Sequence, residues 1–336
     1  MLAAGAQARY GVWQQRKPIV IQADPAAIQQ AVQDLAAGRL VAVPTETVYG
    51  LAADATNGEA VAAIFEAKGR PRFNPLIVHV ADRAMAERIA RFDPISADLA
   101  DRFWPGPLTL VLPLQGDSGI HPLVTAGLDT VALRMPQGLA GDVIAALGRP
   151  IAAPSANTSG RISPTSARAV QDDLGEKLAF VLDGGSTSVG VESTILKVEG
   201  EVVRLLRPGG LTAEDVEAAT GRPVVTGSAG PAIEAPGMLA SHYAPNASVR
   251  LGAHHVEPSE ALLAFGPKRA AGWQQAVEIC NLSARGDLRE AAANLYAFLQ
   301  QLDRSGAATI AVEPIPDRGL GVAINDRLGR AAAPRA

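Results

Sequence analysis

Helical and strand-like apolar patterns alternate along the first two-thirds of the chain. A helix is predicted to begin at Asp24-Pro25 and to end before Gly38, because Asp is a favoured N-cap, Pro a favoured first helical residue and Gly a favoured residue after the last turn. Its apolar face carries Ile28, Val32 and Leu35. The apolar run Leu40–Val43 follows and predicts a buried strand that leads into a polar loop at residues 44–50.

The alternation continues to about residue 210. A second helix, with Val61, Ile64 and Phe65 on its apolar face, is predicted to end at Gly69, and a third covers Asp82–Phe92. Further strands are predicted at Leu76–Val80, Leu108–Leu114, Thr130–Leu133, Ile151–Ala153 and Phe180–Leu182, and a hairpin at Ser193–Val198 and Val202–Leu206 around Glu199-Gly200. Strands that alternate with helices and include a hairpin indicate an α/β fold around a mixed sheet.

The pattern changes after about residue 212. Residues 221–246 are rich in Gly, Pro, Ser and Ala and lack a sustained period, which is typical of a linker or a long ordered loop. Beyond them, an amphipathic helix is predicted over Asp287–Leu302. Short strands are predicted at Val249–Leu251, Leu262–Phe265, Val277–Leu282 and Thr309–Val312. We therefore predict a first domain at residues 17–212, a linker at 213–246 and a small α/β domain at 247–336.

Length and composition agree with two globular domains. The 336 residues exceed what one hydrophobic core usually serves, and 48% hydrophobic residues provide ample core material. The net charge of -4 is evenly spread, since residues 1–210 hold 19 Lys/Arg and 21 Asp/Glu, and residues 211–336 hold 11 and 13. Neither part shows the cationic excess of a nucleic-acid clamp.

Cysteine content and hydropathy bear on the compartment. The single cysteine, Cys280, excludes an internal disulfide framework and a Cys-rich zinc site. The sequence contains no apolar run long enough for a membrane span and no apolar signal segment at its start. The cytoplasm is the predicted location, without membrane contact.

Familiar catalytic motifs are missing from the sequence. No Gly-Lys pair occurs, which excludes a Walker A loop, and Gly319-x-Gly321 lacks the third glycine of a dinucleotide fingerprint. Nucleophile-elbow and zinc-peptidase motifs are also absent, which disfavours a serine hydrolase or a zinc peptidase. Any phosphate site must therefore use another arrangement.

Several polar groups follow predicted strands or helices, and each allows two interpretations. Lys68, Arg70 and Arg72 form either a solvated helix end or an anion site. His79 is either a satisfied core histidine or a ligand-facing hydrogen-bonding group. Arg134, at the end of a buried strand, needs a structural carboxylate or a substrate carboxylate as its partner. The small polar residues 153–160 form either a turn or part of a site.

Seven short motifs in order closely resemble the threonylcarbamoyl-AMP synthase family, the YrdC-like proteins. They are Pro44–Leu51 (PTETVYGL), Lys68–Leu76 (KxRxxxNPL), Trp104–Thr109 (WPGPLT), Arg134–Pro136 (RxP), Ser155–Asn157 (SxN), Glu192–Ile195 (ESTI) and Arg207–Gly209 (RPG). Each motif alone is weak evidence for the family, but seven motifs in the right order are specific to it. The run Ser241–Pro245 (SHYAP) and the second domain resemble the longer form of the family. That resemblance implies a twisted mixed sheet with surrounding helices and a large open cavity, followed by a Rossmann-like domain.

The resemblance also implies an activity and a set of site residues. The reaction would convert ATP, L-threonine and bicarbonate into threonylcarbamoyl-AMP and pyrophosphate, and the product would serve the tRNA threonylcarbamoyltransferase machinery. Carried onto matching positions, threonine contacts fall to Thr47, His79, Arg134, Ser155 and Ser193. The residues around ATP would be Lys68, Arg70, Asn74, Thr130, Asn157, Thr165, Arg207 and Tyr243, with Lys68 and Arg70 also stabilising charge during the reaction.

These roles suit the residue types and leave alternatives open. Arg134 can pair with a carboxylate through two hydrogen bonds. Mg²⁺ is expected to arrive with the triphosphate, because the motifs offer no carboxylate cage. Tyr243 lies in the linker, which is therefore either a lid over the cavity or a passive tether. The alternatives in function are a non-catalytic protein that binds double-stranded RNA through Lys68–Arg72, with weak RNA binding left open, and a carbamoyl-transfer enzyme of metalloenzyme maturation.

Overall fold

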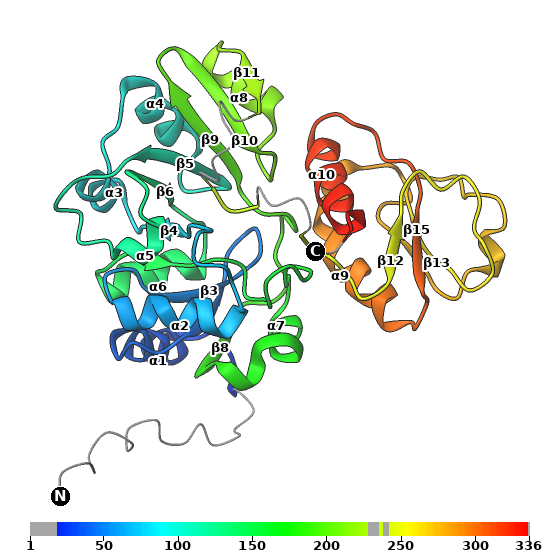
Figure 1. Cartoon of the computed structure of the whole chain (residues 1–336), viewed down its shortest axis with the longest axis horizontal. Helices are drawn as coiled ribbons and strands as arrows, with labels where there is room; N and C mark the ends of the chain where they lie inside the picture. The colour runs from blue at the N-terminus through cyan, green and yellow to red at the C-terminus, as the bar shows by residue number, and fades with distance from the viewer. Residues whose placement is uncertain (1–18, 228–234, 238–241, 335–336) are drawn as a thin grey trace, which may run out of the picture.

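The computed structural model describes residues 19–227, 235–237 and 242–334, in which two α/β domains lie side by side (Figure 1). The strands of the first domain are β1 (Ile19–Gln22), β2 (Val41–Pro44), β3 (Tyr49–Asp54), β4 (Ile77–His79), β5 (Leu108–Pro113), β6 (Thr130–Arg134), β7 (Ile151–Ala152), β8 (Phe180–Asp183), β9 (Thr194–Glu199), β10 (Val202–Arg207) and β11 (Val224–Thr226). Its helices are α1 (Pro25–Ala36), α2 (Gly58–Lys68), α3 (Arg83–Ile89), α4 (Pro94–Phe103), α5 (Pro122–Thr125), α6 (Leu139–Leu147), α7 (Ala167–Leu174) and α8 (Ala213–Thr220).

The described strands of the first domain form one mixed sheet. Their order is β1-β8-β2-β3-β7-β4-β6-β5-β9-β10-β11. Parallel pairs such as β4 with β6 alternate with antiparallel pairs such as β5 with β6 and β9 with β10. The predicted mixed α/β fold and the predicted hairpin are therefore confirmed.

The first helices begin and end where the local sequence indicates. The Asp24 carboxylate accepts a hydrogen bond from the backbone N–H of Ala27 at 2.7 Å and so caps α1. Gly69 ends α2 in the left-handed conformation at φ 60°, which a side chain would disfavour. Local capping chemistry thus sets these boundaries.

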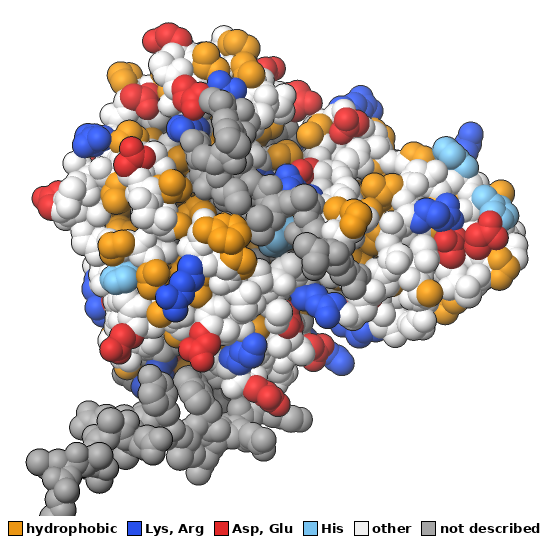
Figure 2. Space-filling model, viewed as in Figure 1, with side chains coloured by type: hydrophobic (Ala, Val, Ile, Leu, Met, Phe, Trp, Pro, Cys, Tyr) orange, Lys and Arg blue, Asp and Glu red, His pale blue; other side chains and the backbone are white. Residues whose placement is uncertain are grey.

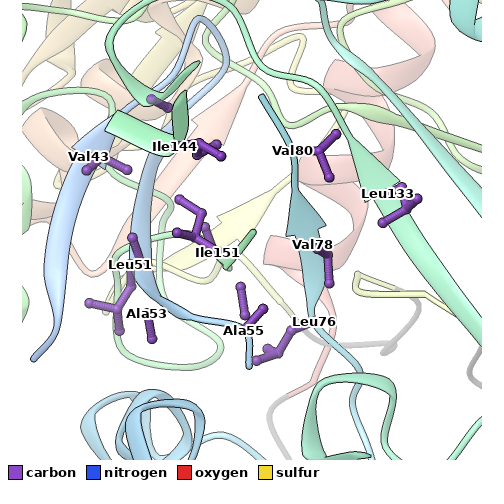
Figure 3. Close-up of a cluster of buried hydrophobic side chains, with 14 of the residues drawn as sticks. Val43, Leu51, Ala53, Ala55, Leu76, Val78, Val80, Leu133, Ile144 and Ile151 are labelled. Atoms are coloured by element: carbon purple, nitrogen blue, oxygen red, sulfur yellow. The ribbon is translucent and has the colours of Figure 1, made fainter. Parts of the chain in front are cut away.

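Apolar side chains from the central strands meet in a continuous core. Val43, Leu51, Val78, Leu133 and Ile151 are all buried and converge in Figure 3. Burial on both faces explains why these strands read as apolar runs instead of alternating patterns. This core holds the strand ends that carry the polar residues.

Some elements differ from the sequence prediction. The segment predicted as a loop at residues 44–50 already contains the start of β3, which pairs with β2 as an antiparallel hairpin. The helix predicted over Asp82–Phe92 is shorter: α3 ends at Ile89, and α4 begins at Pro94 with Asp93 as its cap. Prolines and caps override the periodicity there. The helices α4 to α8 were not predicted, nor was the helix at residues 320–332.

The C-terminal domain is a small parallel α/β unit, as predicted. Its elements are β12 (Ser248–Arg250), β13 (Ala261–Ala264), β14 (Ile279–Asn281), α9 (Leu288–Arg304), β15 (Thr309–Val312) and α10 (Leu320–Ala332). The strand order is β12-β15-β13-β14, with all pairs parallel. In Figure 1, α9 and α10 lie between this sheet and the first domain.

The segment predicted as a linker begins with regular structure. It contains α8 and β11, and β11 pairs in parallel with β10, so the large sheet continues into residues 213–226. Both elements are too short to give a clear periodic pattern. Ser241 of the SHYAP run and residues 1–16 lie outside the described residues. Within the described part of the chain, no helix has the length and apolarity needed to cross a membrane.

Candidate active site

Strand register brings polar residues from distant motifs into one row across the sheet. His79 on β4 is paired with Arg134 on β6, and Arg134 is paired with Thr109 on β5. Ile195 on β9 is paired with both Thr109 and Arg207 on β10. Side chains at equivalent register positions lie side by side, so four of the sequence motifs converge at one level of the sheet.

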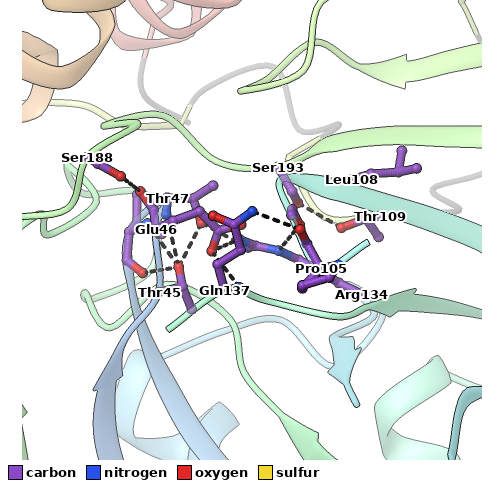
Figure 4. A network of polar contacts seen from close by, with 12 residues as sticks. Thr45, Glu46, Thr47, Pro105, Leu108, Thr109, Arg134, Gln137, Ser188 and Ser193 are labelled. Atoms are coloured by element: carbon purple, nitrogen blue, oxygen red, sulfur yellow. Dashed lines mark hydrogen bonds and ion pairs between the residues drawn. The ribbon is translucent and has the colours of Figure 1, made fainter. Parts of the chain in front are cut away.

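Arg134 is buried and held by three neighbours. Its Nη1 donates to the Thr47 hydroxyl at 2.8 Å, its Nε donates to the Gly106 carbonyl at 3.2 Å, and its Nη2 lies 2.7 Å from a Glu46 carboxylate oxygen. Figure 4 shows these groups reaching toward one another from the 44–48 turn and from β6. The structural carboxylate that the sequence left open as a partner is therefore Glu46.

The WPGPLT motif builds the wall beside Arg134. The Trp104 indole N–H donates to the Leu108 carbonyl at 2.7 Å, and the Gly106 N–H donates to the Met135 carbonyl at 2.8 Å. A Cβ at Gly106 would lie 2.4 Å from the Phe103 carbonyl oxygen, so only glycine fits there. This tight turn presents the carbonyl that Arg134 binds.

Ser193 and Arg207 form a second buried pair. The Ser193 hydroxyl lies 2.7 Å from the Thr109 hydroxyl. Arg207 donates to the Ser193 carbonyl from Nε at 3.1 Å and from Nη2 at 2.8 Å, and Nη2 also lies 3.1 Å from the Ser193 hydroxyl. Its Nη1 donates to the Pro236 carbonyl of the linker at 3.3 Å. Burial lowers the pKa of Arg207 from its ordinary value, with the neighbouring Arg327 also lowering it.

The Lys68–Arg72 cluster is not a solvated helix end. Lys68 is fully buried and donates to the backbone carbonyls of Ser155 and Asn157. Arg70 is also buried and donates to the Asn74 and Pro75 carbonyls at 3.1 and 2.8 Å. Burial lowers the pKa of Lys68 well below its usual range, and Arg70 lowers it further. Of the three cations, only Arg72 is exposed.

The cluster also places Asn74 and Asn157. The Asn74 side chain is buried without a hydrogen-bond partner for either of its polar atoms. Asn157 donates to the Thr158 and Arg161 carbonyls at 2.8 and 2.9 Å, which leaves its buried Oδ1 unpartnered. Buried polar atoms without partners are uncommon and need an explanation, and a ligand would be one.

His79 is buried beside the same cavity. Burial lowers its pKa to about 3, and the charge on Arg134 contributes, so its imidazole is neutral near neutral pH. Its Nδ1 lies 3.3 Å from the Ile77 carbonyl. Because His79 also lines the cavity, both sequence interpretations apply: it is a core residue with a face toward the site.

One cavity collects eight of the predicted site residues. Its lining includes Thr47, His79, Arg134, Ser155, Ser193, Arg70, Arg207 and Tyr243, together with Glu192, Pro236, Gly237 and His242. The cavity volume is about 50 Å³, well below the roughly 300–1,000 Å³ of typical ligand pockets. The large open cavity expected from the sequence is thus nearly closed here, because linker residues occupy its mouth.

Five predicted site residues do not line this cavity. Lys68, Asn74 and Asn157 belong to the hydrogen-bonded cluster beside it, whereas Thr130 and Thr165 lie elsewhere. Thr130 is at the opposite end of β6 from Arg134, about 13 Å along the strand, and lines a separate surface hollow of about 810 Å³. Thr165 is buried in the segment before α7, where its carbonyl accepts from the Thr187 N–H at 3.0 Å. The structure does not bring either residue to the cavity.

Several residues that build the site had no role predicted from the sequence. Glu46 and Glu192 both lie inside quoted motifs: Glu46 lies 2.7 Å from Arg134, and the charge of Glu192 acts on Arg207. Tyr296 and Arg327 belong to the C-terminal domain, yet both contact Glu192. The sequence could have indicated Arg327, because it lies between Ile324 and Leu328 on the apolar face of α10, where a cation is unusual.

The geometry defines a class of protein. Three buried arginines, several hydroxyls and residues of the linker line one cavity, and a buried lysine donates to the backbone beside it. Such a cluster of forked donors suits carboxylate and phosphate groups. We therefore classify the protein as an α/β protein with a buried, arginine-lined cavity whose chemistry suits anions.

Comparison with known proteins places the chain in a family. Residues 33–209 match the Sua5/YciO/YrdC family model, which is described as "Telomere recombination", and residues 211–333 match the "Threonylcarbamoyl-AMP synthase, C-terminal domain" model. The chain is 43% identical to threonylcarbamoyl-AMP synthase of Bacillus subtilis, covering 92% of this chain and 93% of that protein. It is 44% identical to that of Pyrococcus abyssi, over 89% and 92%.

A solved structure agrees with this placement. The crystal structure of P. abyssi Sua5 complexed with L-threonine superposes with a TM-score of 0.84 at 39% identity and covers 94% of this chain and 97% of that chain. The protein belongs to the two-domain Sua5/YrdC family, the family of the threonylcarbamoyl-AMP synthases.

Proposed function

We propose that this protein is a threonylcarbamoyl-AMP synthase, a nucleotidyltransferase that converts ATP, L-threonine and bicarbonate into threonylcarbamoyl-AMP and pyrophosphate. The observation that supports it best is the cavity itself, in which Arg70, Arg134 and Arg207 lie with the hydroxyls of Ser155 and Ser193. The named relatives and the threonine complex of P. abyssi Sua5 support the same substrates.

The residues divide into two groups by chemistry. Arg134 would bind the threonine carboxylate. The Thr47 and Ser193 hydroxyls, which line the same cavity, would bind the threonine hydroxyl, because small hydroxyls distinguish threonine from valine. Lys68, Arg70 and Arg207 would stabilise the negative charge that accumulates as pyrophosphate leaves. Thr130 and Thr165 do not line the closed cavity, and their contact with ATP stays a prediction.

The reaction would proceed through alignment and charge stabilisation. The threonine amine attacks bicarbonate with loss of water, or attacks CO₂ derived from it with loss of a proton. The resulting carbamate oxygen then attacks the α-phosphorus of ATP with loss of pyrophosphate. His79 is a weak base, since its pKa is lowered to about 3, and it would serve as a neutral hydrogen-bonding group. ATP would enter as its Mg²⁺ complex: among the described residues, no group of three or more His, Cys, Asp or Glu side chains lies together.

The linker would act as a lid. Pro236, Gly237, His242 and Tyr243 line the cavity from outside the first domain, and Tyr243 is fully buried there. Because the closed cavity is too small for ATP, substrates can enter only if these residues move away. Tyr243→Leu should weaken ATP binding more than threonine binding, as read by calorimetry, and equal effects on both would argue for a passive tether.

Pyrophosphate release is the direct test of the activity. The protein with ATP and Mg²⁺ should release pyrophosphate only when L-threonine and bicarbonate are both present, and L-valine should not replace threonine. Turnover that ignores threonine would contradict the proposal. The product would then serve enzymes that transfer the threonylcarbamoyl group to tRNA, and processing of the product in the cytoplasm is part of the same proposal.

The alternative functions find less support. Double-stranded RNA binding would rest on the cations of Lys68–Arg72, of which Lys68 and Arg70 are buried and Arg72 is exposed. In Figure 2, acidic and basic side chains are interspersed on the visible face of both domains. A carbamoyl-transfer enzyme of metalloenzyme maturation would carry further modules, whereas the matching relatives are covered almost end to end by this chain.

A further inference from the structure

Glu192 is a buried carboxylate between the cavity and the C-terminal domain. It lines the cavity and directly precedes Ser193. Its Oε1 accepts from the Ser163 hydroxyl at 2.6 Å, and its Oε2 accepts from Arg327 Nε at 2.7 Å. The Tyr296 hydroxyl lies 3.0 and 2.9 Å from the two carboxylate oxygens. Two of these three partners therefore come from helices of the C-terminal domain.

Arg327 is fully buried, and its position is set by packing. Its guanidinium carbon lies 5.0 Å from the centre of the Tyr243 ring, and that ring stacks on Tyr296 at 5.8 Å. Arg327 therefore contacts both the Glu192 carboxylate and the aromatic ring of the linker. Arg327 thus links the C-terminal domain to Glu192 of the first domain and to Tyr243 of the linker at the edge of the cavity.

An apolar interface fixes the two domains around this cluster. Val48 and Val191 of the first domain belong to the same core as Leu295 of α9. Gly190 runs so close to α9 that a Cβ there would lie 2.2 Å from the Ala292 carbonyl oxygen. Interiors packed this closely transmit displacement from one element to the next. The docking of α9 and α10 therefore determines where Glu192 and Ser193 lie.

The charges around Glu192 explain why this matters for anionic substrates. Burial alone would raise its pKa, but Arg327 and Arg207, with the Ser163 hydrogen bond, hold it down to about 2. Glu192 is thus a negative charge at a site that must accept phosphates. Without Arg327, its nearest remaining cationic neighbour would be Arg207, which the substrates also need.

We propose that Arg327 is a positioning residue of the active site, which binds the Glu192 carboxylate with Tyr296 and so keeps Arg207 and Ser193 aligned for the substrates. This inference rests on the proposed function and adds a residue of the C-terminal domain to the same site. It assigns that domain an electrostatic role in substrate binding.

The test compares a single variant with a charge-balanced double variant. Arg327→Met should weaken ATP binding by about 10- to 100-fold, because it leaves Glu192 as an uncompensated charge beside the phosphates. Glu192→Gln combined with Arg327→Met should recover at least tenfold of that loss, since glutamine is neutral. ATP binding is measured by calorimetry on the full chain, together with KM, kcat and the thermal midpoint. Arg289→Met removes the same charge from an exposed position of α9 and should bind ATP like the wild type.

The outcomes separate the possibilities. Wild-type ATP affinity in Arg327→Met would overturn the proposal, as would a double variant no tighter than the single one at equal thermal midpoints. If Arg327→Met does not fold, Arg327→Lys and Tyr296→Phe answer the same question: weaker ATP binding at an unchanged midpoint supports the proposal, and unchanged binding overturns it. A wild-type protein that binds ATP but ignores threonine would contradict the proposed function alone, because the ATP comparison still stands.

Discussion

Replacing Arg134 with lysine tests the threonine site with the smallest change in charge. The guanidinium donates to the Thr47 hydroxyl at 2.8 Å and to the Gly106 carbonyl at 3.2 Å, and lies 2.7 Å from Glu46. Lysine keeps the positive charge, so Glu46 retains a partner. It loses the planar fork that can hold a neighbouring hydroxyl, a backbone carbonyl and a substrate carboxylate at the same time.

The expected magnitudes differ for binding and for stability. Losing one charge-assisted hydrogen bond to the threonine carboxylate should cost about 1.5–3 kcal/mol, which is about 10- to 150-fold in affinity. Losing the bond to Gly106 should cost about 1 kcal/mol of folding free energy, or a fall of roughly 2–4 °C in the thermal midpoint of a domain of this size. Threonine binding should thus suffer far more than folding.

Calorimetric titration with L-threonine, with ATP binding as the internal reference, checks this expectation. Arg102→Lys is the matched control, since Arg102 is an exposed residue of α4 that pairs only with the exposed Asp98 in the described contacts. Unchanged threonine affinity in Arg134→Lys would refute the placement of the threonine carboxylate at Arg134. A parallel loss of ATP affinity would show instead that the whole cavity had collapsed.

Two further predictions follow from buried groups. The pKa of His79 is about 3 in the folded chain, whereas the ordinary value for histidine is 6.5. The folded state therefore binds fewer protons than the unfolded state below about pH 6.5. The free energy of unfolding should therefore fall as the pH is lowered from about 6.5 towards 3, by about 1.4 kcal/mol per unit at most. Urea titrations should show a shallower fall in His79→Asn, and an unchanged slope would mean that His79 is not the group responsible. Gly190→Ala should lower the thermal midpoint sharply, because its Cβ would lie 2.2 Å from the Ala292 carbonyl oxygen. Gly148→Ala is the control: open space surrounds it, so it should cost only the left-handed backbone strain of roughly 1–2 kcal/mol. Equal shifts in the two variants would argue against close domain contact at Gly190.

Local signals made much of the fold predictable. Asp24 and Gly69 carry capping chemistry that acts within one turn, and both mark helix boundaries in the structure. The start of β3 was missed because Tyr49 and Gly50 follow a run of polar residues, and only pairing with β2 makes the segment a strand. The length of α3 was overestimated because Asp93 caps a new helix after it. Pairing and competing caps depend on neighbours that a local pattern does not contain.

The site was predictable as a set of motifs but not as a network. The motif order identified Arg134 and Ser193, and the register of β6, β5 and β9 then explains why they meet. The partner of Arg134 could not be deduced, because Glu46 reaches it only through the turn between β2 and β3. Thr130 was assigned to ATP from the family resemblance alone; it lies at the opposite end of β6 from Arg134, and its contact with ATP stays a prediction.

The C-terminal domain changes how the site motifs should be understood. Glu192, the first residue of ESTI, is stabilised from within the first domain by the charge of Arg207, which the cavity needs for anions. Its compensating cation is Arg327, more than a hundred residues away in sequence and on the apolar face of a helix in the other domain. In this chain, a cation of the second domain therefore balances the charge of a carboxylate that lines the cavity of the first.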